Sequence, residues 1–146
     1  MNKRPSKTSH HIAICEANYL RLDDLLLNFS RDRYEFEVHL DDLNIQYISF
    51  LVLERTKHTL MIEAKQVNKN KSINDFNLRV NIFIDARLAE VASYQSERPL
   101  PFFYKKSFIQ SKDEKNQQNR FLTEWLESIF ISGIAPKSVI EKMLDE

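Results

Sequence analysis

The spacing of apolar residues changes along the chain, and these changes predict its secondary structure. Between residues 12 and 29, apolar side chains recur every three or four positions, at Ile12, Cys15, Tyr19, Leu22, Leu26 and Phe29. This spacing places them on one face of a helix. From residue 34 onward, apolar and polar residues alternate, which indicates a strand that is buried on one side. The sequence therefore predicts an N-terminal helix followed by strands.

The alternation continues through further segments that are separated by short polar connections. The expected strands cover residues 34–40, 45–54, 60–64, 78–84 and 87–94. The second of these carries apolar residues on both alternating faces, as a central strand does. The last is weaker because its alternating residues are small and Pro99 follows it. Consecutive strands with short connections favour an antiparallel meander.

The helical period returns near the C-terminal end. Ser111 stands three residues before Glu114, which is the spacing of a capping box, and a helix that starts there would end at Gly133. Its expected buried stripe is Gln118, Phe121, Leu122, Trp125, Leu126, Ile129 and Phe130. Pro136 and the apolar residues after it predict a short final helix. The predicted fold class is α+β: an antiparallel β-meander of about five strands, with an N-terminal helix, a long C-terminal helix and a short final helix packed on one face.

Length and composition narrow the class of protein. A chain of 146 residues, of which 42% are hydrophobic and 29% charged, suits one globular domain. We expect residues 1–9 to form a flexible arm and residues 10–146 to form that single domain. The 21 basic and 21 acidic side chains cancel, which argues against nucleic-acid binding. With one cysteine and no apolar run near the ~18 residues of a membrane span, we expect a soluble, cytoplasmic protein without a membrane segment.

Three sequence blocks carry a resemblance to a family. They are Ile14-Cys15-Glu16-Ala17-Asn18-Tyr19, Asp85-Ala86-Arg87-Leu88-Ala89-Glu90-Val91, and the segment 113–126. Over about residues 12–135 the chain resembles the YqiB-like family of bacterial proteins, domain of unknown function 1249. This resemblance implies a small bacterial cytoplasmic protein and transfers no catalytic residue. The chain departs from the family pattern at Asn81, where the pattern has Arg, at Ile84, where it has His, and before Lys105, where a Tyr-Pro-Asn turn is missing.

One pair of acids is a candidate site. Asp85 ends an apolar strand and Glu90 lies five residues later in the next one, so a tight hairpin could bring both carboxylates to one cation or substrate. The alternative is a turn-forming Asp85 and a Glu90 that faces solvent or forms an ion pair. We favour the alternative because no His, Cys or third acid stands at a defined spacing.

Four polar residues near the start of the long C-terminal helix are candidates for binding a ligand or partner. Asp113 lies in the first helical turn, where an acid also satisfies free amide groups. Lys115 follows one half-turn later, and Gln117 and Asn119 flank the apolar stripe. The two amides could bind the backbone of a neighbouring loop or a ligand, and we favour the structural use.

Glu63-Ala64-Lys65 offers a rival chemistry. The triplet follows an apolar strand and resembles the Glu-x-Lys half of a restriction-type nuclease core, in which Asp42 or Glu54 would complete a Mg²⁺ site. The next segment is predicted as a strand where that fold has a helix, which opposes this interpretation. The four histidines lack ligand spacing, so no metal site is predicted. The aromatic and basic residues 102–112 could stack on nucleic acid, but a loop folded under a sheet explains them better.

The sequence leads to one functional expectation and one alternative. We expect a non-enzymatic binding or regulatory module without a cofactor. It would bind a protein partner, a second copy of itself as a homodimer, or a small ligand, through the space between the long helix and the sheet. The alternative is a divalent-metal-dependent hydrolase or nuclease that uses Asp85 with Glu90, or Glu63 with Lys65.

Overall fold

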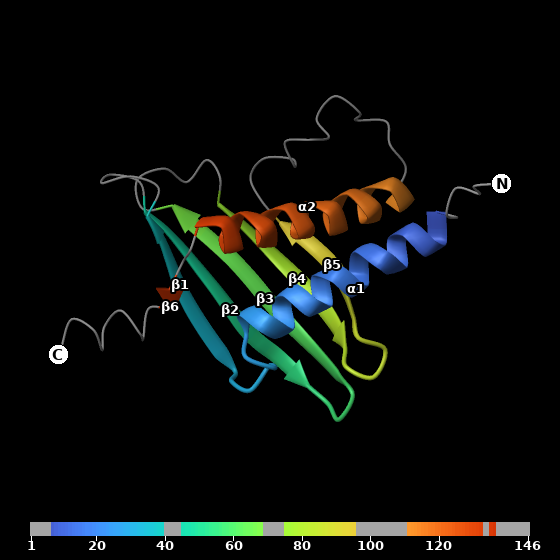
Figure 1. The fold of residues 1–146 in the computed structure, drawn as a ribbon, viewed down its shortest axis with the longest axis horizontal. Helices are drawn as coiled ribbons and strands as arrows, with labels where there is room; N and C mark the ends of the chain where they lie inside the picture. The colour runs from blue at the N-terminus through green and yellow to red at the C-terminus, as the bar shows by residue number, and fades with distance from the viewer. Residues whose placement is uncertain (1–6, 40–44, 69–74, 96–110, 133–134, 137–146) are drawn as a thin grey trace.

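The fold is a single antiparallel sheet with two helices across one of its faces (Figure 1). The computed structural model describes residues 7–39, 45–68, 75–95, 111–132 and 135–136. In chain order the elements are α1 (Lys7–Leu25), β1 (Arg33–His39), β2 (Ile45–Arg55), β3 (Thr59–Asn68), β4 (Phe76–Phe83), β5 (Leu88–Gln95), α2 (Ser111–Ser132) and β6 (Ala135–Pro136). The predicted α+β meander of five long strands between an N-terminal and a C-terminal helix is confirmed.

The strand order follows the chain order, except at one edge. The sheet runs β5-β4-β3-β2-β1-β6, and each neighbouring pair of strands is antiparallel. β2 therefore lies inside the sheet, as its two apolar faces indicated. The two-residue β6 pairs with Phe36 and Glu37 of β1. Pro136, which was expected to start a helix, lies in this edge strand instead, where a missing N–H is tolerated. The rest of the expected final helix lies outside the described residues.

The first helix differs from its prediction at both ends. It begins at Lys7, so residues 7–9, which were expected in the arm, belong to the helix. It ends at Leu25, because Leu27, Asn28 and Phe29 have φ angles of 53°, 60° and 57°, in the left-handed region. This turn carries Phe29 back into the core, where its ring lies 5.7 Å from that of Tyr19. The helical spacing of apolar residues in the sequence extends to Phe29, beyond the end of the helix, because the turn also buries that residue.

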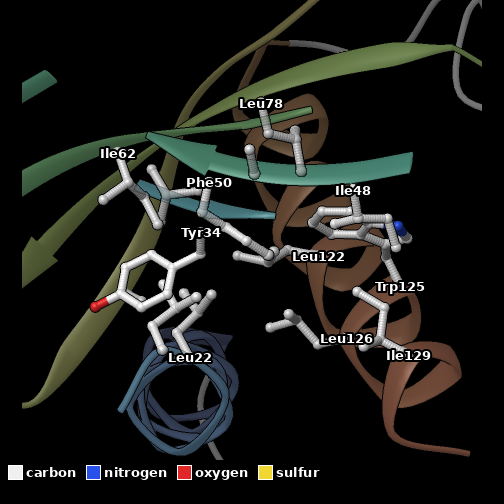
Figure 2. Close-up of a cluster of buried hydrophobic side chains, with 14 of the residues drawn as sticks. Leu22, Tyr34, Ile48, Phe50, Ile62, Leu78, Leu122, Trp125, Leu126 and Ile129 are labelled. Atoms are coloured by element: carbon white, nitrogen blue, oxygen red, sulfur yellow. The ribbon is translucent and has the colours of Figure 1, made fainter. Parts of the chain in front are cut away.

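The core lies between the helices and one face of the sheet, as Figure 2 shows. The ring of Trp125 lies 5.6 Å from that of Phe50 on β2 and 5.0 Å from that of Phe76 on β4. Its indole Nε1 donates a hydrogen bond of 2.8 Å to Gln66 Oε1 on β3. Phe130, near the C-terminal end of α2, was expected in the buried stripe but is 42% exposed, so the buried face of the helix is narrower there. Burying one large apolar side chain contributes roughly 1.5–3 kcal/mol, so this layer dominates the stability of the fold.

Candidate binding surface on the open face of the sheet

The space between α2 and the sheet, where we expected a ligand or partner to bind, is filled by core side chains. Leu122, Leu126 and Ile129 of α2 are at most 2% exposed. Figure 2 shows these residues and Trp125 pointing toward the side chains of Ile48 and Phe50. This layer is therefore a structural core.

The carboxylates of Asp85 and Glu90 have different partners. Asp85 Oδ2 lies 2.7 Å from His58 Nδ1, between two neighbouring turns of the sheet. Glu90 Oε1 lies 3.7 Å from His11 Nε2 on α1, and the same histidine nitrogen lies 3.6 Å from Cys15 Sγ. Within the described part of the chain, no group of three or more His, Cys, Asp or Glu side chains is placed to hold a metal ion.

Cys15 is a buried thiol. Burial, with a smaller contribution from the negative charge of Glu90, raises the pKa of Cys15 to about 11. A nucleophilic cysteine needs the opposite shift, because the thiolate is the reactive form. His11 and Glu90 therefore surround a protonated thiol, and this cluster fits a structural contact between α1 and β5.

Two of the polar candidates on α2 bind the backbone of β5. Asn119 is fully buried, its Oδ1 accepts a hydrogen bond of 2.8 Å from Val91 N, and its Nδ2 donates to Lys115 O. Lys115 Nζ donates to Val91 O at 2.8 Å and to Ala92 O at 3.1 Å. Gln117 Oε1 is buried without a hydrogen-bond partner among the described residues. Asp113 lies in the first turn of α2, and its side chain is outside the described part.

These contacts cover the outer edge of the sheet where β5 is irregular. The pairing register shifts between Arg79, opposite Ser93, and Val80, opposite Val91, so Ala92 is the extra residue of a bulge. An edge strand with free backbone groups is a template for unwanted pairing, and bulges and covering elements reduce that hazard. Lys115 and Asn119 thus attach α2 to this edge and satisfy its polar groups.

Glu63 and Lys65 lie on the face of the sheet that the helices leave open. Glu63 Oε2 is 3.9 Å from Arg79 Nε on β4. Lys65 is exposed, and its neighbours across the sheet are Ser49 and Asn77. Of the acids proposed to complete a metal site with them, Glu54 pairs opposite Met61 in the sheet, and Asp42 lies outside the described residues.

The open face also carries large apolar side chains. Tyr47 and Leu53 on β2, Val67 on β3 and Phe83 on β4 are between 36% and 40% exposed. Tyr47, Val67 and Phe83 alternate along their strands with the buried residues of the core, and Leu53 is the extra residue at a bulge in β2. An antiparallel sheet with one solvated face normally places polar residues there. Sequence reasoning missed this surface, although apolar residues at both alternating positions of residues 45–54 were its signal.

Comparison with known proteins places the chain in a family. Residues 21–134 match the family described as "Protein of unknown function (DUF1249)". The chain belongs to this family. It is 28% identical over 123 residues to the uncharacterized protein YqiB of Escherichia coli K12, covering 82% of this chain and 86% of that protein. YqiB of strain O157:H7 and YqiB of strain CFT073 match to the same extent. No solved structure matches the chain.

The matched region of the DUF1249 family contains all five long strands and α2. The open face of the five long strands therefore lies within the part of the chain that this family shares. No helix among the described residues is long and apolar enough to cross a membrane.

Proposed function

We propose that this DUF1249 protein is a non-enzymatic binding module of the bacterial cytoplasm that presents the open face of its sheet to a protein. The observation that carries this proposal is the presence of four exposed apolar side chains on a face with no described element over it: Tyr47 and Val67 are paired toward one end of the strands, and Leu53 and Phe83 lie toward the other end (Figure 1). Exposed apolar surface of this kind is typical of interaction sites. The single cysteine, buried as a free thiol, fits a reducing compartment.

The shape of this surface favours a protein over a small ligand. Small-molecule sites are concave and enclose most of the ligand. The open face is the outer side of a sheet, and its side chains stand out over several neighbouring strands. A second protein can cover such a broad surface, whereas a small ligand would stay largely in water.

Charged residues among the apolar ones would give this contact specificity. Glu63 is only 19% exposed at its side chain and lies beside Arg79, while Lys65 is exposed two residues further along β3. Protein interfaces combine apolar contacts with polar groups that fix the register and exclude wrong partners. The open face has both kinds of residue within a few strands.

Site-specific photo-crosslinking in living cells tests the proposal. A photoreactive phenylalanine analogue replaces Tyr47 or Phe83 on the open face, and Leu20, which is 54% exposed on α1, provides the control position. We expect covalent protein adducts from positions 47 and 83 and none from position 20. The absence of adducts from the open face, or equal adducts from all three positions, would overturn the proposal.

A further inference from the structure

We infer that the protein bound at the open face is a second copy of this chain, related to the first by a two-fold axis. This inference rests on the proposed function and names its partner. Two adjacent rows of side chains cross the open face of the sheet. One row is Arg33, Leu51, Glu63 and Arg79, and the next is Glu35, Ser49, Lys65 and Asn77.

The two rows have opposite charges at matching strands. On β1, Arg33 in the first row corresponds to Glu35 in the second, and on β3, Glu63 corresponds to Lys65. A two-fold axis nearly perpendicular to the strands, between the rows, lays the first row of one copy over the second row of the other. Glu63 then faces the partner's Lys65, and Arg33 faces the partner's Glu35. Symmetry repeats both contacts, because a two-fold interface is self-complementary.

The apolar residues of the open face follow the same symmetry. Tyr47 and Val67 stand opposite each other in the row beyond Ser49 and Lys65. The corresponding row on the other side of the axis contains Met61 and Glu54, with the bulge residue Leu53 beside Glu54 on β2. Tyr47 thus faces the partner's β2 at Leu53 and Glu54, and Val67 faces the partner's Met61. Apolar contacts would flank the central charge pairs on both sides.

A different axis gives a poor fit. A two-fold axis parallel to the strands, between β2 and β3, lays β1 of one copy over β4 of the other. Arg33 would then face the partner's Arg79, and Leu51 would face the partner's Glu63. Like charges placed together across an interface cost several kcal/mol. Charge complementarity therefore selects the axis perpendicular to the strands.

The size of the face is compatible with a dimer that uses all of it. Strands ~4.8 Å apart that rise ~3.3 Å per residue give five strands a flat footprint on the order of 20 by 25 Å. Specific interfaces bury about 800 Å² of accessible surface per partner. Because side chains make the face uneven, its accessible area is larger than the flat footprint and approaches that value. Two sheets packed face to face at about 30° would form a four-layer sandwich with the helices outside.

Charge-reversal variants test this arrangement in solution. Sedimentation velocity on the full chain, over a concentration series from micromolar to millimolar, should show a monomer–dimer equilibrium. Lys65→Glu places two acids together at each central contact, and Glu63→Lys places two bases there, so each change should weaken the dimer at least about tenfold. The matched control is Lys57→Glu, the same charge change at an exposed residue in the turn between β2 and β3, which should leave association unchanged.

Mixing the two variants gives the decisive result. A Lys65→Glu copy offers Glu63 and the new acid, and a Glu63→Lys copy offers Lys65 and the new base, so every central contact between them joins opposite charges. The mixture should therefore form heterodimers at concentrations where each variant alone is mostly monomeric. Circular dichroism on each variant verifies that it is folded. A wild-type monomer throughout the series, or a mixture that stays monomeric, would overturn the inference.

The crosslinking experiment separates this inference from the proposed function. Adducts from position 47 with twice the mass of the chain support the second copy. Adducts with a different protein would overturn the inference that the partner is a second copy, and they would still support the proposed function as a binding module. No adducts from the open face would overturn both.

Discussion

At the scale of single residues, buried polar groups fix how the helices meet the sheet. Asn18 on α1 is fully buried, and its Nδ2 donates to Asn119 O on α2, while its Oδ1 accepts from Thr123 Oγ1 at 2.7 Å. Trp125 is tied to Gln66 in the same layer. A buried polar group without a partner costs about 1–3 kcal/mol, so these bonds favour one packing arrangement over its alternatives.

Replacement of Trp125 separates packing from hydrogen bonding. Trp125→Ala should lower the free energy of unfolding by about 3–5 kcal/mol, because it leaves a cavity between the rings of Phe50 and Phe76. Trp125→Phe keeps most of the ring but leaves Gln66 Oε1 unpaired, so a loss of about 1–3 kcal/mol is expected. Urea unfolding followed by circular dichroism measures both. As controls, Glu90→Gln and Gln117→Ala should remain folded, and a fully stable Trp125→Ala protein would refute the core assignment.

The Cys15 thiol predicts a stability change at alkaline pH. Its pKa is raised from 9.0 to about 11 in the folded protein, by burial first and by the charge of Glu90 second. Below pH 9 the thiol is protonated in both states, so this contribution to stability is fully present. Between pH 9 and about 11 the unfolded chain releases its proton while the folded protein holds it, so the free energy of unfolding falls by about 1.4 kcal/mol per pH unit.

Comparison with Cys15→Ala isolates this effect, because other groups that titrate at alkaline pH are common to both proteins. Urea unfolding between about pH 8 and pH 10.5 should show a steeper loss of stability in the wild type than in the variant. Parallel pH profiles would show that the thiol has its ordinary pKa. A reagent for free thiols should also react with Cys15 only after unfolding, since the side chain is 3% exposed.

At the scale of secondary-structure elements, the contact between α2 and β5 combines attachment with protection of an edge. Asn119 satisfies the N–H of Val91, and Lys115 satisfies the carbonyls of Val91 and of the bulge residue Ala92. The opposite edge of the sheet, at β1, is extended by β6, which pairs with Phe36 and Glu37. Both edges therefore carry local features that limit uncontrolled strand pairing.

Asn119→Ala should destabilise the protein by about 1–3 kcal/mol, because it leaves the buried N–H of Val91 without an acceptor. Lys115→Met keeps the aliphatic stem but removes the donors to Val91 O and Ala92 O, so a smaller loss is expected. Hydrogen exchange localises the effect: the amide of Val91 should exchange faster in Asn119→Ala, while amides in β2 keep their protection. Unchanged exchange at Val91 would remove Asn119 from this role.

Sequence patterns predicted elements better than the contacts between them. Alternation located all five long strands, and the capping-box spacing located the start of α2 at Ser111. The end of α1 was missed because the left-handed turn at residues 27–29 buries Phe29 at a spacing that also fits a helix. The role of Asn119 was left open because its acceptor function depends on Val91, 28 residues away. The open face could not be assembled without the register that aligns β2, β3 and β4.

At the scale of the whole molecule, the two faces of one sheet have different tasks. The covered face is a closed core in which Phe50, Ile62 and Leu78 are at most 1% exposed. The open face holds apolar side chains that are 36–40% exposed, beside rows of charged side chains. Apolar side chains left this exposed contribute less to stability than fully buried ones, which agrees with the proposal that this face serves association.

A pair of substitutions distinguishes these tasks. Tyr47→Thr combined with Val67→Thr replaces apolar surface by a residue with good strand propensity, so the free energy of unfolding of the dilute protein should change by no more than about 0.5 kcal/mol per site. The dissociation constant of the dimer should rise about tenfold or more, because both residues face apolar groups across the two-fold axis. Phe50→Ala on the covered face is the reverse case, with a loss of about 3–5 kcal/mol in stability. Urea unfolding at low concentration and sedimentation at high concentration measure the two quantities separately. If the double threonine variant were strongly destabilised yet associated like the wild type, the open face would belong to the folding core, and the division between the two faces would be wrong.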